Sequence, residues 1–468
     1  MIPPVFPLES AQISGLPDDA RAQLTELLKI YAQHYAKNAV KAKYYAGDIP
    51  LSEVNLGIAL PQGMAGLEIG CAWGAKTVDV LAGRSLFDGY VGAEGQDVPE
   101  LQALVSKNRL VAEYQRHCRD ELTFGCTFST LSKDPVLGCR IRFHTPRSAA
   151  ARWNGEKGRI DCGFAVLATE DPAVTGEPRP TVIALYTDSD TWVLRRKNML
   201  WRAQRVPHKL GRPLMEPLIW NATSEKPFGQ SRIGNPVRRL IQGYVRTVAN
   251  ATIGLEFSTT PQKYLLGVTD EQFDAVVNDK FRQYVGSILT ATTNPDTGQN
   301  PSFGQLLQGN IQPHIEMMRL LSTQFSAATG LSVSDTGVVN DANPTSSEAL
   351  EAQTATLIGL AEQLNTGNGD PLRAIALMAL AIANDTTVEA LSDEQKAVVA
   401  HFKSPNMPSV AASADAATKI ASVRQGFAQT DVFLEMMGFD PADIRRIKAQ
   451  EQRNRGLDFF GSLTEEET

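Results

Sequence analysis

Two amphipathic helical segments, joined by a mixed stretch over residues 257–311, constrain this chain more than any other feature. The first spans Asn235 to Glu256, with Pro236 in its first turn, where a missing N–H costs little. The second spans Gln312 to Gly330, and its final glycine is a typical helix stop. Each segment has one apolar stripe, which needs a packing partner. The stripes are formed by Val237, Leu240, Ile241, Tyr244, Val245 and Val248, and by Ile315, Met318, Leu321 and Phe325.

A polar loop of unusual length, Leu331 to Ser346, follows the second helical segment. It is rich in Ser, Thr, Asn and Asp, and it holds no Lys or Arg. Loops of this length inside compact domains are often functional. Another helix is predicted to begin at Ser347 and to run to about Leu364.

The part of the chain before residue 235 combines helices with strands. Apolar residues at three- and four-residue spacing predict helices over 17–47, 73–85 and 98–119. From about residue 120 to 206, short β-type runs separated by turn residues predict an antiparallel sheet. After residue 410 the composition favours surface helices. Together these patterns predict an α+β fold.

The composition permits a sizeable core but does not favour tight binding to nucleic acid. The chain has 468 residues, of which 43% are hydrophobic and 21% charged, as in ordinary soluble proteins. Its net charge is -7, whereas a protein that grips phosphate backbones usually has a basic surplus. The start, MIPPVFPLES, does not resemble a secretory signal, and no apolar run is long enough to span a bilayer. We expect a soluble protein made in a cytoplasm, with no membrane partner.

No motif predicts a cofactor, a metal ion or a catalytic centre. The five cysteines have no CxxC spacing and are expected to be buried thiols. The six histidines show no HxxxH or HExxH spacing, and no GxxxxGKS or GxxxxGKT loop is present to cradle phosphates. No GxSxG elbow occurs either. We therefore predict that the protein is not an enzyme and has no cofactor and no metal.

One segment indicates a different function. GLEIGCAWGAKTVDVLAG, residues 66–83, looks like the first motif of methyl-donor-dependent methyltransferases. Glu68, Gly70 and Gly74 fit that motif, but Ala72 stands where the tightest turn normally needs glycine. The preceding LPQGMA is not a convincing buried strand, and no α/β alternation follows. A methyltransferase is therefore kept as an alternative.

The segment PFGQSRIGNPVRRLIQGYVRTVANATIGLEFSTTPQKYLLGV, residues 227–268, resembles the portal family of long-tailed bacteriophages. In that family a G-x-S-R-I turn opens a helix that carries an R-T pair, and a phrase of the type P-Q-K-Y-x-x-G follows. The matching positions are Gly229, Ser231, Arg232, Ile233, Arg246, Thr247, Pro261, Gln262, Lys263, Tyr264 and Gly267.

Three further segments resemble the same family in collinear order. FDGYVG, followed by NRLVAEYQRHCRDELTFGCTFSTL, is similar to the wing segment. TQFSAATGLSVSDTGVVNDANPTSSEALEAQTATL is similar to the second stem helix, the tunnel loop and the helix after it. SADAATKIASV, followed by LEMMGFDPADIRRI, resembles the closing region. The resemblance covers roughly residues 75–460, while 1–70 and 138–200 match only in general texture.

The resemblance implies a portal fold with an α/β wing, a two-helix stem, a small α/β clip, a tunnel loop and a helical crown. Portals of this family are rings, usually of twelve subunits. By position, the implied regions are the wing at 1–234 and 347–410, the first stem helix at 235–256, the clip at 257–311, the second stem helix at 312–330, the tunnel loop at 331–346, and the crown with the C-terminal tail at 411–468.

The same resemblance implies a non-enzymatic channel at one capsid vertex for packaging and ejection of double-stranded DNA. The implied partners are further copies of this chain, double-stranded DNA, the large terminase subunit, a head–tail adaptor, and the major capsid and scaffold proteins. The protein would reside in the virion, and in the host cytoplasm during assembly. Another virion structural protein, such as a scaffold or minor capsid component, remains an alternative, although it would lack the two long helices and the polar loop.

The tunnel loop would point at DNA in this family. A loop that touches moving phosphates should offer weak hydrogen bonds, because fixed cations would hold the strand. Asp335 and Asp341 would repel the phosphate backbone and help to centre it. The simpler interpretation is an ordinary exposed loop. The predicted DNA-facing residues are Ser334, Asp335, Thr336, Asn340, Asp341 and Asn343.

The charged residues of the stem helices have two interpretations. They form either a positive band that faces the channel or salt bridges between packed helices of neighbouring subunits, and we favour the second. Identical subunits packed head-to-tail in a closed ring would also bury the apolar stripes. The stem residues concerned are Arg238, Arg239, Arg246, Glu316 and Arg319. The residues predicted for docking at the clip are Asn294, Asp296, Gln299 and Asn300.

Overall fold

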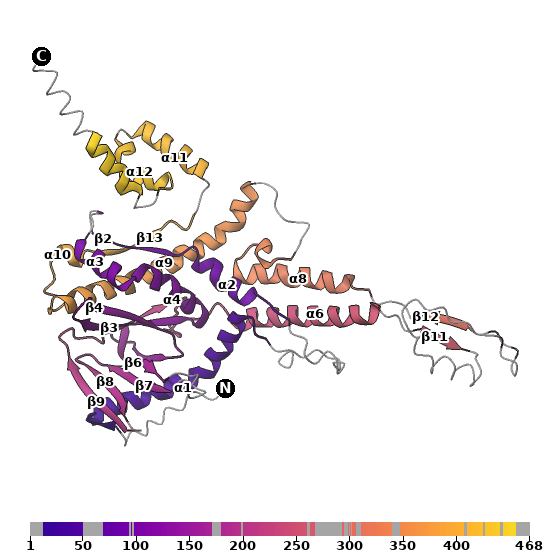
Figure 1. Ribbon diagram of the computed structural model, residues 1–468, viewed down its shortest axis with the longest axis horizontal. Coiled ribbons are helices and arrows are strands. Elements are labelled where there is room, and N and C mark those ends of the chain that lie inside the picture. The colour runs from indigo at the N-terminus through magenta and orange to yellow at the C-terminus, as the bar shows by residue number, and fades with distance from the viewer. Residues whose placement is uncertain are drawn as a thin grey trace, which may run out of the picture. The chain divides into compact units, whose positions relative to one another are not determined.

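The computed structural model shows mixed helix and sheet, which confirms the α+β class (Figure 1). The chain divides into two compact units, Met1–Lys403 and Ser404–Thr468. The residues that the structure describes are 13–49, 69–92, 95, 98–170, 179–197, 200–259, 263–266, 293, 298, 300, 302–305, 310–338, 347–406, 410–424, 426–439 and 443–454.

A six-stranded sheet forms one layer of the first unit. Its strand order is β1-β9-β8-β7-β6-β5. Neighbouring strands are antiparallel except β1 and β9, which pair in parallel. The strands are β1 (Ile13–Ser14), β5 (Ala149–Asn154), β6 (Arg159–Thr169), β7 (Pro180–Tyr186), β8 (Asp190–Lys197) and β9 (Leu200–Pro207).

Helix α1, Asp18–Ala46, covers one face of this sheet and confirms the helix predicted over 17–47. Its apolar stripe, which includes Leu27 and Tyr31, is buried in one cluster with Phe164 and Leu185 of the sheet. The Tyr31 ring meets the Phe164 ring edge-on at a centroid distance of 5.7 Å. The sheet is therefore the partner that the helical periodicity required.

A second sheet has three strands in the order β10-β3-β4. The prediction of one antiparallel sheet over residues 120–206 was therefore incomplete. The third strand comes from beyond that block and pairs antiparallel with β3. Alternation of apolar and polar residues predicts a strand but does not indicate which strand it pairs with. The sequence therefore could not divide the strands between two sheets. The strands are β3 (Cys126–Asp134), β4 (Gly138–His144) and β10 (Met215–Ile219).

Helix α9 spans Ser347–Ala383 and continues well beyond the predicted end near residue 364, so that predicted end was wrong. The prediction stopped where glycines and Pro371 weaken helix propensity. Tertiary packing overrides that preference, because Leu372 and Ile375 are buried in the main hydrophobic cluster. Figure 1 shows α9 beside β3 and β4.

Further helices and strands of the first unit contribute to its core. The single helix predicted over 98–119 is two helices, because Arg109 adopts a left-handed conformation with φ of 52°. A two-stranded antiparallel sheet joins segments that are far apart in the chain. These elements are α2 (Trp73–Ala82), β2 (Leu86–Val91), α3 (Pro99–Asn108), α4 (Leu110–Phe124), α10 (Asp393–Lys396) and β13 (Val399–Lys403).

The described part of the second unit is helical, which confirms the surface helices predicted after residue 410. It contains α11 (Val410–Val423), the short 3-10 helix η5 (Phe427–Gln429) and α12 (Asp431–Met436), and it is helical again over 443–454. The Phe427 and Phe433 rings meet edge-on at 5.9 Å.

The described residues were also compared with the expectations about membrane spans, metal ligands and cysteines. Across the described ranges, no helix is both long and apolar enough to cross a membrane. Within the same residues, no grouping of His, Cys, Asp and Glu could hold a metal ion. All five cysteines are buried and free, which confirms the prediction of buried thiols.

A buried polar network links α4 to α9 through Glu121, whose side chain is 0% exposed. The Asn368 amide donates to the Glu121 carboxyl at 2.8 Å and to the Tyr114 hydroxyl at 3.2 Å. Burial raises the pKa of Glu121 to about 8. The folded protein therefore holds this proton at pH values where the unfolded chain releases it.

We expect this proton to make stability depend on pH. An unfolded glutamate titrates near 4.5, so the contribution is complete below that pH and is lost as pH rises through about 8. The loss should approach about 1.4 kcal/mol per pH unit within that window. The Glu121→Gln variant should lack this slope. The difference is measured by the melting temperatures of both proteins at pH values from 5 to 8.5, taken about every half pH unit. Parallel curves of melting temperature against pH would contradict the assignment.

Candidate functional site

Two long helices of the first unit, α6 (Asn235–Thr259) and α8 (Gln312–Thr329), pack side by side (Figure 1). We call this pair the stem hairpin. Gly243 lies at the close approach, where an added Cβ would be 3.3 Å from a Leu321 methyl. Both helices therefore exist where the apolar stripes predicted them. The buried stripe residues are Val237, Ile241, Val245, Leu321 and Phe325.

An aromatic stack fixes the base of the stem hairpin. Trp73 of α2 lies between the rings of Tyr244 and Phe325, with centroid distances of 4.4 and 4.6 Å. Its side chain is 3% exposed, and its indole N–H donates to the Thr336 carbonyl at 3.0 Å. One residue of α2 thus holds both stem helices and the turn that follows them.

That turn is the first part of the predicted tunnel loop, and it is a short 3-10 helix, η4 (Val333–Thr336). Ser332 and Asp335 form a capping box, in which each side chain bonds to the other residue's backbone N–H. Ser334 is exposed and Asp335 is half-buried. Thr336 is buried, and its hydroxyl lies 2.6 Å from the Ser322 hydroxyl. The interior therefore takes up the Thr336 side chain, which leaves little of it to contact DNA.

The G-x-S-R-I turn joins the stem hairpin to the rest of the first unit. The Ser231 hydroxyl donates to the Thr123 carbonyl at 2.5 Å. The Arg232 guanidinium donates to the carbonyls of Thr77 at 2.8 Å and Thr329 at 2.5 Å. Burial lowers the pKa of Arg232 to about 10, which still leaves it charged at neutral pH. One half-buried cation thereby ties this turn to α2 and to the C-terminal end of α8.

Gly229 of the same turn has no room for a side chain. Its φ is +70°, and an added Cβ would lie 2.1 Å from the Trp220 carbonyl oxygen. Only glycine adopts this conformation at such a close approach without strain. The resemblance placed a glycine here, and the packing of the turn explains it.

The predicted stem charges have different environments. The Arg238 guanidinium lies 5.8 Å from the centre of the Tyr44 ring and also bonds to the Asn235 side chain. Arg239 and Arg246 are exposed on the same face of α6, about two turns apart, and neither has an ion-pair partner among the residues that the structure describes. On α8, Glu316 is exposed and Arg319 is half-buried.

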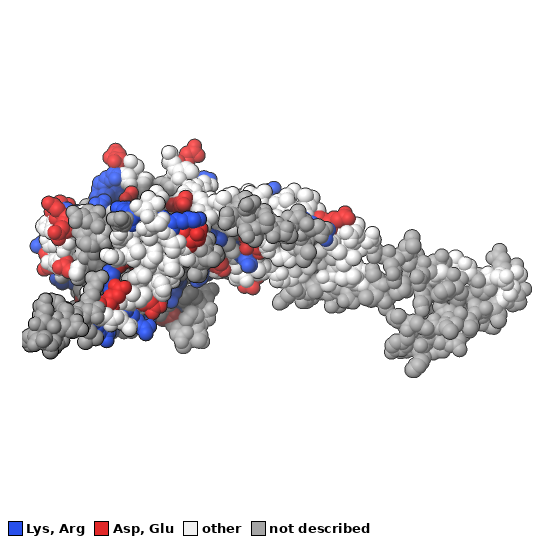
Figure 2. Space-filling view, turned by 90° about the horizontal axis from the view of Figure 1, so that it is seen from above, with Lys and Arg blue, Asp and Glu red and all other residues white. Residues whose placement is uncertain are grey.

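The stem hairpin also exposes large apolar side chains. Met317 and Leu320 of α8 are 43% and 51% exposed, and Leu255 of α6 is 46% exposed. Figure 2 shows a mostly uncharged surface on the visible part of this hairpin. Exposed apolar groups on a helical hairpin are typical of a surface that packs against another protein.

The predicted clip is described only in part. A two-stranded antiparallel sheet, β11 (Lys263–Leu266) with β12 (Ser302–Gln305), joins its two ends. Asn300 accepts a hydrogen bond from the Thr293 hydroxyl at 2.9 Å. Three of the predicted docking residues, Asn294, Asp296 and Gln299, lie outside the described residues, as do Asn340, Asp341 and Asn343 of the predicted tunnel loop.

The glycine-rich segment that suggested a methyltransferase has a structural role. An added Cβ on Gly74 would lie 1.9 Å from the Tyr44 carbonyl oxygen, so this glycine lets α2 pack directly on the end of α1. Gly70, by contrast, has open space around its Cα. The described residues before α2 form no strand leading into it. The described strands near this turn form no parallel sheet around it.

Sequence reasoning identified the stem helices but missed their anchor. Trp73, Thr77 and Tyr44 lie far from the stem in the chain, and nothing local indicates that they contact it. One signal was available, because tryptophan is large and a tryptophan at a helix start beside a glycine needs a specific packing partner.

The described site is thus a stem hairpin with exposed apolar side chains, anchored on an α+β body. The chain is 24% identical over 467 residues to the portal protein of Mycobacterium phage L5, covering 96% of this chain and 92% of the relative. It is 23% identical over 429 residues to the portal protein of Mycobacterium phage D29, covering 88% and 85%. These similarities confirm the resemblance to phage portal proteins and support a phage portal function.

Two further comparisons complete this picture. No protein family model matches the chain. Among solved structures, a chain of the virion of a native gene transfer agent particle is similar at a TM-score of 0.46 and 11% identity, covering 86% of this chain and 94% of that chain. A chain from the neck of the native particle, computed with C12 symmetry, has the same TM-score. At this level the structural likeness adds nothing to the assignment.

Proposed function

We propose that the chain is the subunit of a portal ring, usually of twelve copies, through which double-stranded DNA enters and leaves a capsid. The observation that carries the proposal is the stem hairpin, which exposes Met317, Leu320 and Leu255. It also exposes two arginines that have no ion-pair partner among the described residues. Monomeric proteins rarely expose large apolar patches. Identical copies packed head-to-tail around a closed ring would cover this surface.

The proposed ring has no enzymatic role of its own. The large terminase subunit would dock on the clip around Asn294, Asp296, Gln299 and Asn300 during packaging, and the head–tail adaptor would dock there afterwards. Major capsid and scaffold proteins would contact the wing. The protein would assemble in the host cytoplasm and remain at the portal vertex of the virion. The similarity to two curated portal proteins supports this assignment as a whole.

Negative-stain images of the purified protein test the ring. We expect discs with an axial hole. Monomers, or discs without a hole, would overturn the proposal. Calorimetry with a methyl donor is the matching test of the alternative enzyme, and we expect no heat of binding.

The arginines of the stem provide a second test. If Arg239 and Arg246 pair with acidic groups of a neighbouring subunit, the double change to alanine should shift the protein from rings toward smaller species in gel filtration at low salt. The matched control is Lys29→Ala with Lys37→Ala, which removes two exposed cations from α1. Intact rings with altered DNA packaging would instead favour a positive band that faces the channel.

The polar loop provides a third test, and we propose that Ser334, Asp335, Asn340, Asp341 and Asn343 face the DNA. Because Asp335 and Asp341 would repel phosphates, changing both to lysine should slow packaging without preventing ring formation. Packaging rates in vitro, with ring integrity checked by imaging, measure this effect. A normal packaging rate in the double variant would count against a DNA-facing loop.

A further inference from the structure

A cavity of about 330 Å³ lies where the six-stranded and three-stranded sheets meet the C-terminal end of α9. Ala184 and Val193 of the six-stranded sheet, Leu131 of the three-stranded sheet and Ile382 of α9 contribute apolar wall. This volume is within the range of ligand-binding pockets. The stem hairpin contributes no residue to it, so the cavity is independent of the proposed channel.

Two polar side chains of the cavity lining have unused hydrogen-bonding capacity within the described chain. The Thr191 side chain is 8% exposed, and its buried hydroxyl has no hydrogen-bond partner among the described residues. The His208 ring faces the Thr187 carbonyl, but neither ring nitrogen forms a well-aligned hydrogen bond within the described chain. Burying a polar group without a partner is unfavourable. Both side chains line the cavity, so a bound acceptor could satisfy them.

The charges around the cavity favour an anionic occupant. Arg142 and Lys209 line it and have no ion-pair partner among the residues that the structure describes. The one acidic residue of its lining, Asp385, lies 3.3 Å from the Lys133 amine.

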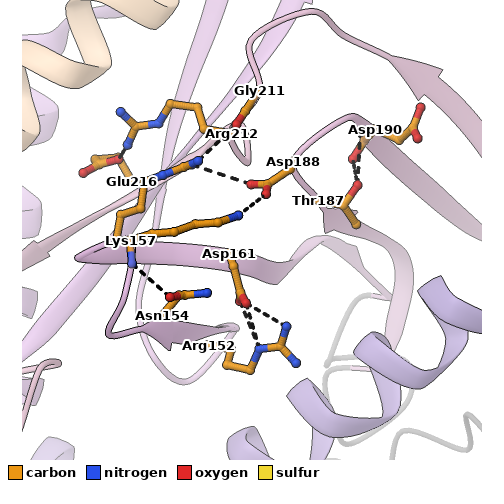
Figure 3. Close-up of polar contacts among 11 residues, drawn as sticks. Arg152, Asn154, Lys157, Asp161, Thr187, Asp188, Asp190, Gly211, Arg212 and Glu216 are labelled. Atoms are coloured by element: carbon orange, nitrogen blue, oxygen red, sulfur yellow. Dashed lines mark hydrogen bonds and ion pairs between the residues drawn. The ribbon is translucent and has the colours of Figure 1, made fainter.

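Acidic residues close to the cavity are also neutralised by partners of their own. Asp188 pairs with Lys157 at 2.6 Å, as Figure 3 shows, and Asp190 pairs with Arg205 at 2.7 Å. These acids are therefore not available to the cations of the cavity wall. The surplus near the cavity mouth is positive.

The same face of the six-stranded sheet continues this positive charge away from the cavity. Arg195 lies two residues beyond Val193, so both point to one face of the strand. Arg195 is directly opposite Arg202 in the β8–β9 register, and both are exposed. Like charges opposite each other destabilise an antiparallel pair. An anionic partner on this face would remove that repulsion.

We propose that this cavity and the cationic sheet face beside it bind an acidic peptide segment of a partner protein, anchored by one apolar or aromatic side chain. The anchor would fill the apolar cavity, and a neighbouring carboxylate would accept hydrogen bonds from Thr191 and His208. Acidic residues along the segment would then meet Arg142, Lys209 and Arg195. Duplex DNA fits less well, because its phosphates would gain nothing from contact with an apolar cavity wall.

The test measures peptide binding by fluorescence anisotropy, with the full-length chain in its native assembly. The probe is a fluorescein-labelled peptide of glutamates with one central benzoylphenylalanine. Changing Arg142 and Lys209 together to glutamate should weaken binding at least tenfold. The control, Lys29→Glu with Lys37→Glu, makes the same charge change on α1, which covers the opposite face of the sheet, and should change binding less than twofold.

Three results together support the proposal. The native chain binds the probe, the Arg142 and Lys209 variant selectively loses that binding, and the probe photocrosslinks to fragments of the chain that contain Ala184 or Leu214. Absence of binding would overturn it. Equal weakening by both variant pairs would also overturn it, because the attraction would then be general charge. A polyglutamate peptide without the anchor that binds equally well, or a duplex DNA that displaces the probe from the cavity, would exclude the anchored peptide.

Discussion

Replacing Trp73 with alanine is expected to lower the free energy of unfolding of the first unit by about 3–5 kcal/mol. The side chain is 3% exposed and stacks against both Tyr244 and Phe325, so its removal leaves a cavity between three elements. It also removes the donor to the Thr336 carbonyl. Urea denaturation followed by circular dichroism measures the loss.

A Trp73→Phe variant separates the two contributions at this position. Phenylalanine keeps an aromatic ring between Tyr244 and Phe325 but lacks the indole N–H. The hydrogen bond and the smaller ring together should cost about 1–3 kcal/mol, less than the alanine change. If alanine and phenylalanine proved equally harmful, the hydrogen bond and not the stack would hold the stem. If neither had an effect, the described anchor would be incorrect.

Replacing Gly74 with alanine is the second large effect that we expect. The new Cβ would lie 1.9 Å from the Tyr44 carbonyl oxygen and 2.7 Å from its carbon. Both atoms belong to the backbone, so α2 must move away from α1 for the methyl group to fit. Overpacking of this kind costs about 3 kcal/mol or more when the obstacle cannot rotate away. Thermal unfolding should show a clearly lower melting temperature.

Gly70 is the matched control within the same glycine-rich segment. Its added Cβ would meet nothing within 4 Å, so Gly70→Ala should change stability by no more than about 0.5 kcal/mol. A methyl-donor loop would instead make both glycines matter for binding and neither decisive for stability. Equal destabilisation by the two substitutions would show that the close contact with Tyr44 does not explain Gly74.

The stem helices show how far local sequence patterns reach. Pro236 near one helix start and Gly330 at the other helix end are local signals, and the structure places α6 and α8 where those signals predicted. Periodicity also indicated which residues are buried, including Ile241 and Phe325. These features depend on neighbouring residues of one helix, so a single sequence contains them.

The second half of α9 shows where those patterns fail. Glycines and Pro371 predict a helix end, yet the helix continues to Ala383 because Leu372 and Ile375 are buried against distant strands. Burial of several such side chains outweighs the weak local preference. The same limit explains Thr336, which belongs to a polar loop by sequence but bonds to Ser322 inside the fold.

By itself, the sequence determined the α+β class, the two stem helices, the buried thiols and a resemblance to phage portals that two curated relatives confirm. Only the tertiary structure decided what holds the stem, because Trp73 bonds to Thr336, and Arg232 to Thr77 and Thr329, across long separations in the chain. It also decided that Gly74 serves helix packing, since the atom that excludes a side chain there belongs to Tyr44. Local patterns specify which face of an element is apolar, but the partner of that face depends on the whole chain.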